Sequence, residues 1–209
     1  MYRNIIKPTL DFVFSLLLII VLSPLMLIVA IITLIDLGFP LHNLLREREG
    51  KNRKTYIMYK FRTKAMDPDG TTKSNTYTKV SKFLDKTRLN ELPQLFNILF
   101  GQMSFVGPRP FIPGESEKFE GMIDKKRYMM RPGVTGLAQT NGGRSISTAR
   151  KLEYDVEYYD NMSFWLDLKI IITTIGQILT LDVDKANKKI ADEINERNGI
   201  PIDDEEEEK

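Results

Sequence analysis

The sequence predicts a mostly helical α/β fold, in which a membrane-embedded N-terminal segment precedes a small domain of short helices with a β-hairpin. Residues 12–35 are apolar apart from two serines and one threonine, which indicates a helix inside a bilayer. Residues 56–63 alternate between two faces as a β-strand does, and apolar side chains at helical spacing in residues 92–99 and 164–175 indicate helices. A chain of 209 residues is long enough for one such domain with appendages.

Charge is nearly balanced, with a formal net value of +2, but it is unevenly distributed. Basic residues gather after the apolar segment, at Arg46, Arg48, Lys51, Arg53, Lys54, Lys60, Arg62 and Lys64. A basic cluster in this position is more typical of a protein that meets anionic lipid or phosphate than of one that binds nucleic acid. The chain has no cysteine and a single histidine, His42, which excludes disulfides, thiolate chemistry and a zinc site built on histidines.

The apolar segment carries a proline at its centre. A straight helix over residues 12–35 would be about 36 Å long, enough to cross a hydrocarbon core of roughly 30 Å. Pro24 removes an amide donor and crowds the carbonyl of Ile20, so we expect a bend there, with the Ser23 hydroxyl able to bond a carbonyl one turn back. Each half is then roughly 18 Å long, which is too short to cross alone.

The charges that flank this segment do not distinguish a hairpin from a span. Arg3 and Lys7 precede it, and Arg46, Arg48 and Lys51 follow it, so both ends carry the positive charge typical of the cytoplasmic face. A re-entrant hairpin and a kinked span are therefore both consistent with the residues, since spanning helices tolerate proline. In either case the denser basic cluster places the chain after residue 45 in the cytoplasm. The long apolar run without a small-residue cleavage site argues against a signal peptide.

The predicted strand at residues 56–63 has Lys60 and Arg62 on one face. Such a cationic stripe is either an ordinary solvated face or part of a phosphate-binding wall. Residues 67–78 are rich in Asp, Gly, Thr, Ser and Asn and predict a loop, which is either a passive connector or a mobile cover.

A short helix is predicted over about residues 91–100, with Gly101 as the residue just past its end. Pro93 is acceptable only in the first turn and fixes the helix start close to Asn90. Asn90 is then either a plain N-cap or, together with Glu91, part of a phosphate site at the positive end of the helix.

Two further segments combine cationic side chains with glycine or proline. Arg109 lies between two prolines, and their stiff backbone lowers the entropy cost of holding a guanidinium group on an oxyanion. Residues 131–144 are glycine-rich and include Arg131, Gln139 and Arg144. This composition would suit close backbone approach to a nucleotide, although glycine-rich loops are common.

The C-terminal third predicts helices. Asp155 and Asp167 fall in a helical region, where their carboxylates would hold Mg²⁺ or sugar hydroxyls, or pair with the basic stripe. The apolar face in residues 164–175 would pack into the core or lie on the bilayer surface. Residues 182–198 predict a charged helix, and the acidic tail after residue 199 predicts disorder.

The runs KTRLNELPQLFN at residues 86–97 and GQMSFVGPRP at residues 101–110 closely resemble the signature of the bacterial sugar transferases called monotopic phosphoglycosyl transferases. The resemblance extends from Met1 to about Leu179. The family transfers a sugar-1-phosphate from a UDP-sugar to undecaprenyl phosphate, with Mg²⁺, at the cytoplasmic face of the bacterial inner membrane, and so begins assembly of a surface glycan. The family's membrane helix is re-entrant and broken at a Ser-Pro pair, which implies a hairpin at Ser23-Pro24.

The resemblance also implies an organisation and a site. The regions are a membrane hairpin in residues 1–44, a transferase domain with amphipathic membrane-surface helices in residues 45–185, and a charged helix with a disordered acidic tail in residues 186–209. The catalytic positions are Asn90 and Glu91, and Glu91 is the expected Mg²⁺ ligand. Substrate-binding positions are Lys60, Arg62, Arg109, Arg131, Gln139, Arg144, Asp155 and Asp167. The expected partners are a UDP-sugar, undecaprenyl phosphate and membrane lipid but no nucleic acid, and a homodimer is left open.

Asn90 departs from the family pattern, in which this position is an aspartate that attacks the donor and carries the phosphosugar. A neutral carboxamide is a poor nucleophile, so that role does not transfer to Asn90. Three alternatives follow. In the first, Glu91 acts as the nucleophile, or as a base and metal ligand. In the second, the phosphosugar is transferred directly between the bound substrates, and in the third the chain is an inactive homologue, natural or engineered, that binds nucleotide or lipid phosphate. We favour an active enzyme that depends on Glu91, because the cationic and glycine motifs around it are intact.

Overall fold

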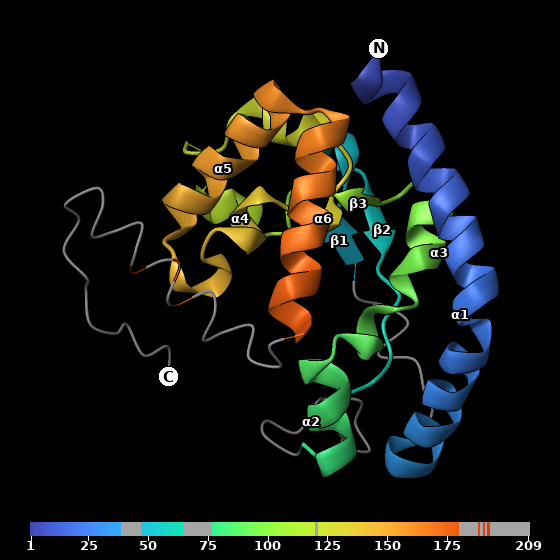
Figure 1. Ribbon diagram of the computed structural model, residues 1–209. Helices are drawn as coiled ribbons and strands as arrows, with labels where there is room; N and C mark the ends of the chain where they lie inside the picture. Colours follow the sequence, from blue (N-terminus) through green and yellow to red (C-terminus); the bar gives the residue numbers. More distant parts are fainter. Residues whose placement is uncertain are drawn as a thin grey trace.

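The computed structural model describes residues 1–38, 47–64, 77–119 and 121–179, and the single residues 188, 190 and 192. The long helix α1 (Lys7–Leu37), preceded by a π-helical turn at Tyr2–Ile6, stands along one side of the molecule (Figure 1). Beside it lie two small sheets and the helices α2 (Lys79–Lys86), α3 (Gln94–Leu99), α4 (Leu137–Thr140), α5 (Thr148–Asn161) and α6 (Phe164–Leu179). The predicted mostly helical fold with a small β component is confirmed. Most of the predicted helix at 182–198, the acidic tail and nearly all of the loop at 67–78 lie outside the described residues. The three described residues of the predicted helix, 188, 190 and 192, are helical.

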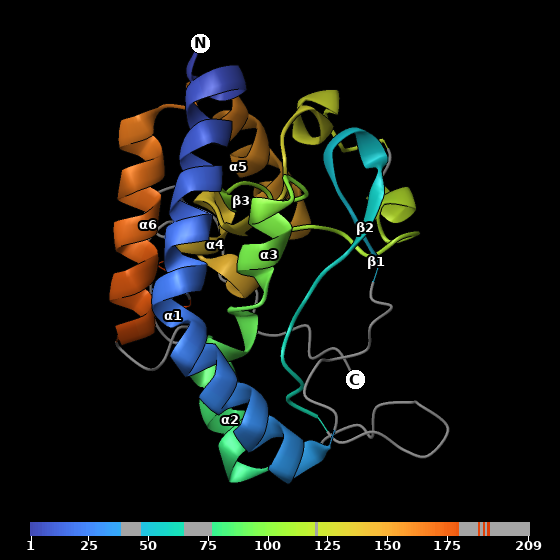
Figure 2. The same ribbon diagram turned by 90° about the vertical axis from the view of Figure 1, so that its right-hand side faces the viewer.

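Helix α1 remains helical across Pro24 and curves along its length (Figure 2). The Ser23 hydroxyl donates a hydrogen bond of 2.8 Å to the carbonyl of Ile20, the group that Pro24 leaves without an amide donor, as the sequence predicted. Residues 2–37 form a helix long and apolar enough to cross a membrane, with a mean hydropathy of 3.1 over its most apolar stretch and only 11% of that stretch buried. Most of its apolar side chains are therefore free to face lipid.

One stripe of α1 faces the rest of the protein, and its N-terminal part is polar. Lys7, Asp11 and Ser15 are buried at successive four-residue steps. The ammonium group of Lys7 lies 2.7 Å from Asp167 of α6. Asp167 also accepts hydrogen bonds of 2.6 Å from the hydroxyls of Tyr2 and Tyr158. This buried network ties the start of α1 to α5 and α6.

The antiparallel hairpin pairs β1 (Glu47–Glu49) with β2 (Thr55–Ile57), placing Arg48 opposite Tyr56. The predicted strand over residues 56–63 was too long. After Ile57 the side chain of Asn97 takes the place of a neighbouring strand, because its Nδ2 donates to the Ile57 carbonyl at 2.7 Å and its Oδ1 accepts from the Tyr59 amide at 2.9 Å. Because the strand ends at Ile57, side chains no longer alternate between two faces over residues 56–63. Tyr56 and Phe61, which would lie on opposite faces of a continuous strand, are both buried.

The second sheet pairs β3 (Ser104–Val106) with β4 (Gly133–Thr135) in parallel. Three glycines, Gly107, Gly133 and Gly136, bring the backbones after these strands so close that a Cβ on any of them would lie within 2.3 Å of a backbone atom of the opposite segment. The glycine-rich composition of residues 131–144 was predicted to suit close backbone approach to a nucleotide. In the structure Gly133 and Gly136 permit close approach of their own backbone to Gly107, which holds the segment that carries Arg109.

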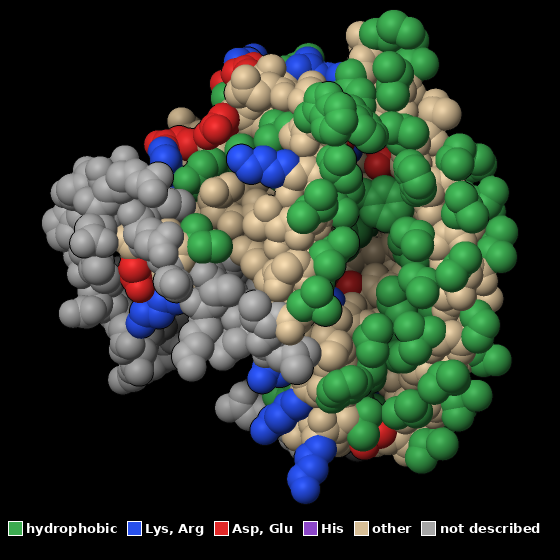
Figure 3. All heavy atoms as spheres, viewed as in Figure 1, with side chains coloured by type: hydrophobic (Ala, Val, Ile, Leu, Met, Phe, Trp, Pro, Cys, Tyr) green, Lys and Arg blue, Asp and Glu red, His purple; other side chains and the backbone are tan. Residues whose placement is uncertain are grey.

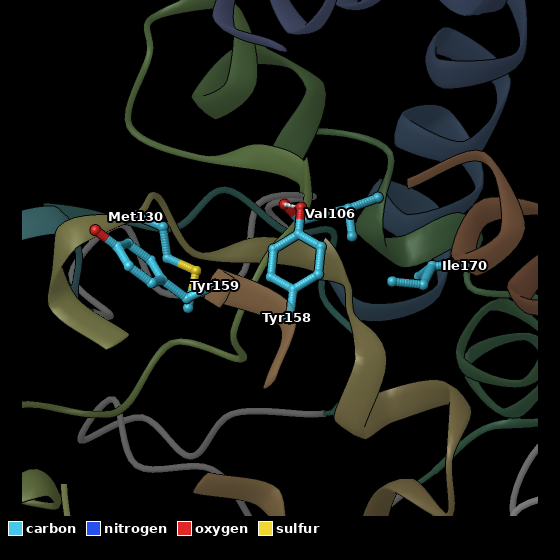
Figure 4. Close-up of a cluster of buried hydrophobic side chains, with 5 residues drawn as sticks. All are labelled: Val106, Met130, Tyr158, Tyr159 and Ile170. Atoms are coloured by element: carbon cyan, nitrogen blue, oxygen red, sulfur yellow. Dashed lines mark hydrogen bonds between the residues drawn. The ribbon is translucent and has the colours of Figure 1, made fainter. Parts of the chain in front are cut away.

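Helices α5 and α6 close over this sheet. Val106, Met130, Tyr158, Tyr159 and Ile170 form the buried apolar cluster shown in Figure 4. The Tyr158 hydroxyl also donates to the backbone carbonyl of Val106 at 3.3 Å, so the cluster has a polar link to β3. The outer face of α6 remains uncovered in the structure, with Trp165, Ile172, Ile175 and Leu179 exposed.

Candidate functional site

A cavity of about 700 Å³ lies among α3, α4, α5, α6 and the segment that follows β3. This volume falls in the usual range for small-molecule sites. Its charged lining residues are Arg88, Glu91, Arg109, Glu115, Lys118, Arg127, Arg144, Lys151 and Asp155, and Gln139 is one of its polar lining residues. Helix α6 contributes Thr174, Gln177 and Ile178, so the cavity lies directly behind the helix whose outer face is apolar. Figure 3 shows a furrow between the apolar side chains of α6 and α1, with acidic side chains visible in its floor.

The structure brings together half of the residues predicted from the sequence. Glu91, Arg109, Gln139, Arg144 and Asp155 all line the cavity. Lys60 stands next to it, with its ammonium group 3.5 Å from a Glu91 oxygen. The remaining four, Asn90, Arg62, Arg131 and Asp167, are not among the lining residues.

Three of those four have other contacts. Arg62 donates a hydrogen bond of 2.7 Å to the carbonyl of Leu37 and so caps the C-terminus of α1. The guanidinium of Arg131 packs against Gly101, the left-handed residue just past α3, whose position was predicted correctly. Asp167 belongs to the buried network that holds α1.

The surroundings of Arg109 disfavour its charged form. The protein around it lowers the pKa of its guanidinium group, Glu91 opposes this effect, and the nearby charges of Arg144 and Arg88 add to it. Its side chain nevertheless has an exposed surface, as expected for a group that opens into a cavity. Two guanidinium groups close enough to disfavour the charge of Arg109 form, together with it, a site that gains stability from a bound anion.

Glu91 is held between two cations. One of its oxygens lies 3.5 Å from the Lys60 ammonium and 3.3 Å from the Arg88 guanidinium. Arg88 adopts a left-handed conformation (φ 59°), which turns the chain between α2 and the 3₁₀ turn at Leu89–Glu91. No role was predicted for Arg88, because the sequence pattern alone does not show this turn.

Asn90 does not cap a helix. The helix predicted over residues 91–100 is divided into the 3₁₀ turn Leu89–Glu91 and α3, whose N-cap position is occupied by Pro93. Asn90 is fully buried and donates from Nδ2 to an Asp85 oxygen at 2.8 Å, while its backbone carbonyl accepts from the Phe61 amide at 2.8 Å. Its side-chain oxygen has no hydrogen-bond partner among the residues that the structure describes. A buried acceptor in this state disfavours the folded protein unless a ligand, ion or water satisfies it.

Asp155 pairs with Arg127, which the sequence analysis did not identify. Arg127 donates from Nε to Asp155 at 2.9 Å and from its other arm to the Arg109 carbonyl at 2.5 Å. Arg127 therefore positions the backbone of Arg109 and fixes the Asp155 carboxylate. Burial raises the pKa of Asp155 from 3.8 to about 6, although Arg127 acts in the opposite direction.

This pKa predicts a pH-dependent change in stability. Between about pH 4 and pH 6 the folded protein binds more protons at Asp155 than the unfolded chain does, so the free energy of unfolding should fall as the pH rises through this window. We therefore expect the thermal unfolding midpoint, measured in detergent across pH 3.5–7 and plotted against pH, to have a different slope in the parent and in Asp155→Asn. The difference should be confined to this window. The exposed Asp160, which pairs with Lys126, serves as the matched control, and Asp160→Asn should keep the parent's slope. Equal slopes in the parent and Asp155→Asn would contradict the raised pKa.

Comparison with known proteins agrees with this site. The model of the family "Bacterial sugar transferase" matches residues 2–181. A UDP-glucose:undecaprenyl-phosphate glucose-1-phosphate transferase of Klebsiella pneumoniae is 39% identical over 179 residues, covering 79% of this chain and 38% of the relative. A UDP-N-acetylgalactosamine-undecaprenyl-phosphate N-acetylgalactosaminephosphotransferase of Aeromonas hydrophila is 35% identical, covering 84% of this chain and 44% of the relative. The chain thus spans about two fifths of the length of these relatives. The extent of the family match and these identities show that the chain belongs to the bacterial sugar transferase family.

Proposed function

We propose that the protein transfers a sugar-1-phosphate from a UDP-sugar to undecaprenyl phosphate, releases UMP, and so carries out the first membrane step in assembly of a surface polysaccharide or glycoconjugate. The observation that carries this proposal is the arginine-lined cavity directly behind the apolar outer face of α6. Such a site can bind a water-soluble diphosphate and a lipid-bound phosphate together. The relatives named above use a UDP-sugar and undecaprenyl phosphate according to their names.

The cavity residues suit a nucleotide diphosphate. Arg88, Arg109 and Arg144 supply the positive charge that a diphosphate requires, and guanidinium groups bind phosphate oxygens in pairs. The side-chain oxygen of Gln139 is buried at the cavity without a hydrogen-bond partner among the described residues. It is available to accept a hydrogen bond from a donor group on the nucleotide or sugar.

The site offers few protein ligands to a Mg²⁺ ion. The described ranges contain no group of three or more acidic or histidine side chains that could enclose a metal ion. Mg²⁺ commonly binds one or two carboxylates together with substrate phosphates, and Glu91 supplies one such carboxylate at the cavity. When bound, the ion would neutralise charge that develops on the phosphates. The side chains themselves hold the phosphates and orient the donor.

The proposal places the protein in the bacterial inner membrane, with residues 45–185 on the cytoplasmic face and the helix of residues 2–37 re-entrant. The support is the curved α1 with its central proline, the basic residues at both of its ends, and the apolar outer face of α6. A hairpin would leave the exposed Asn4 in the cytoplasm.

Cysteine labelling tests this topology in a chain that contains no cysteine. In intact cells, Asn4→Cys should stay unlabelled by an impermeant maleimide and should react after the membrane is permeabilised. Glu117→Cys, at an exposed position in the transferase domain, is the matched control and should behave in the same way. Labelling of Asn4→Cys but not Glu117→Cys from outside would contradict the hairpin and favour a spanning helix.

A competing function is that of an inactive homologue that binds nucleotide or lipid phosphate. The burial and neutral amide of Asn90 favour this alternative. UMP release in detergent, measured with undecaprenyl phosphate and a panel of UDP-sugars, separates the two. We expect UMP release with at least one donor. Without the lipid, UMP release should stop after a single turnover. Saturable UDP binding with no release for any donor would favour the inactive homologue.

A further inference from the structure

Three side chains with oxygen atoms, those of Asp85, Asn90 and Glu91, lie close together in the sequence and differ in how far a substrate can reach them. Of the three, Glu91 lines the cavity. Asn90 has no exposed surface. The Glu91 side chain is 17% exposed and the Asp85 side chain is 39% exposed. Access therefore increases from the residue at the family's catalytic position to Asp85, a residue at the end of α2 that the sequence analysis did not consider.

The Asp85 carboxylate lies one hydrogen bond away from the side chain at position 90. One Asp85 oxygen lies 2.8 Å from Nδ2 of Asn90. The left-handed turn at Arg88 folds the chain back, so that residues five apart in the sequence face each other. The same Asp85 oxygen lies 3.9 Å from the Lys60 ammonium, which also contacts Glu91. Asp85 thus borders the cation cluster that flanks the cavity.

The two carboxylates have different environments. Glu91 has two cations within 3.5 Å, and both withdraw charge from its oxygens. Asp85 is oriented by a neutral amide and has its cation at a greater distance. A carboxylate fixed by one amide and partly open to solvent keeps more of its nucleophilic character than one held by two cations.

We propose that Asp85 is the nucleophile of this enzyme and that Asn90 acts as the amide that orients it. This inference rests on the proposed function. An Asp85 oxygen attacks the phosphorus that carries the sugar, forming an acyl-phosphate bond while the bond from that phosphorus to the bridging oxygen breaks and UMP leaves with that oxygen. The phosphate oxygen of the polyprenyl phosphate then attacks the same phosphorus, forms the new diphosphate and releases the Asp85 carboxylate unchanged. No oxidant, reductant or further reactant is needed.

Trapping and mapping the adduct tests the first step. With UDP-sugar and no polyprenyl phosphate, the full-length parent should release a burst of UMP equal to the enzyme concentration. Borohydride then converts an acyl phosphate to a stable alcohol, and trypsin separates the candidates: cleavage after Lys82, Lys86 and Arg88 leaves Asp85 in residues 83–86 and Glu91 in residues 89–118. The modified residue is expected in the shorter peptide. Modification in residues 89–118, or turnover without a burst, would overturn the proposal.

A charge-removing variant provides a second readout. Asp85→Asn keeps the shape and the acceptor for Asn90, so the thermal midpoint and UDP binding should change little while kcat falls by at least ~10³-fold, in keeping with loss of a nucleophile. Asp160→Asn, at an exposed and paired aspartate that is not among the cavity-lining residues, is the control and should keep parental kcat.

The outcomes separate this inference from the proposed function. An active parent that retains its kcat in Asp85→Asn would overturn the role of Asp85 and leave the transferase function intact. A parent that releases no UMP with any donor would overturn the transferase function itself, and the assignment of Asp85 with it.

Discussion

Replacing Glu91 by glutamine is expected to lower kcat for UMP release by at least ~10²-fold, the usual scale for loss of a catalytic carboxylate. The variant keeps the size of the side chain but removes the charge that Lys60 and Arg88 contact and the carboxylate available to Mg²⁺. The thermal midpoint should change little, since Glu91 is partly exposed to the cavity.

Glu153→Gln is the matched control for this experiment. Glu153 forms an exposed pair with Arg150 on α5, so its loss should leave kcat unchanged. If Glu91→Gln retains parental turnover, then Glu91 is neither a metal ligand nor a base in this enzyme. A Mg²⁺ titration of the parent and of Glu91→Gln distinguishes a metal ligand from a base, because loss of a ligand raises the Mg²⁺ concentration required for half-maximal rate.

Truncating Asp167 to alanine is expected to destabilise the protein by about 3–5 kcal/mol, the scale for breaking a buried ion pair on one side. The change leaves the Lys7 ammonium buried without its partner at 2.7 Å, and it also removes the acceptor for Tyr2 and Tyr158. A lowered thermal midpoint in detergent is the measurement.

The triple variant Lys7→Met, Asp11→Asn and Asp167→Leu separates an unpaired charge from general damage. Because it removes the Lys7 ammonium together with both carboxylates within 4.0 Å of it and restores apolar volume, it should lose less stability than Asp167→Ala. An Asp167→Ala protein as stable as the parent would contradict the assignment of Asp167 to the attachment of α1.

The parts of the fold that depend on local rules could be predicted from the sequence. Proline stereochemistry predicted the Ser23 hydrogen bond to Ile20, and glycine at a helix end predicted the left-handed Gly101. Helical spacing predicted α6 and its apolar face, although only the structure shows that this face is left uncovered. These features involve residues close together in the chain.

Features that depend on distant contacts were not predicted. Asn97 replaces a β-strand partner for Ile57 and Tyr59, forty residues away, and no local pattern marks an asparagine for that role. The ion pair between Lys7 and Asp167 joins residues 160 positions apart, so no local pattern predicts it. A pattern search also cannot find the contact between Asp85 and Asn90, because it depends on the backbone conformation of Arg88.

The central claim is that the phosphate next to the sugar moves to the lipid together with the sugar. The most direct test uses a UDP-sugar with ³²P in the phosphate attached to the sugar, incubated with the purified protein, undecaprenyl phosphate and Mg²⁺. We predict that the label enters the organic phase as a polyprenyl-diphosphate sugar, while unlabelled UMP remains in the aqueous phase. Label retained in aqueous UDP while the sugar enters the lipid, or no labelled lipid with any UDP-sugar, would contradict the account.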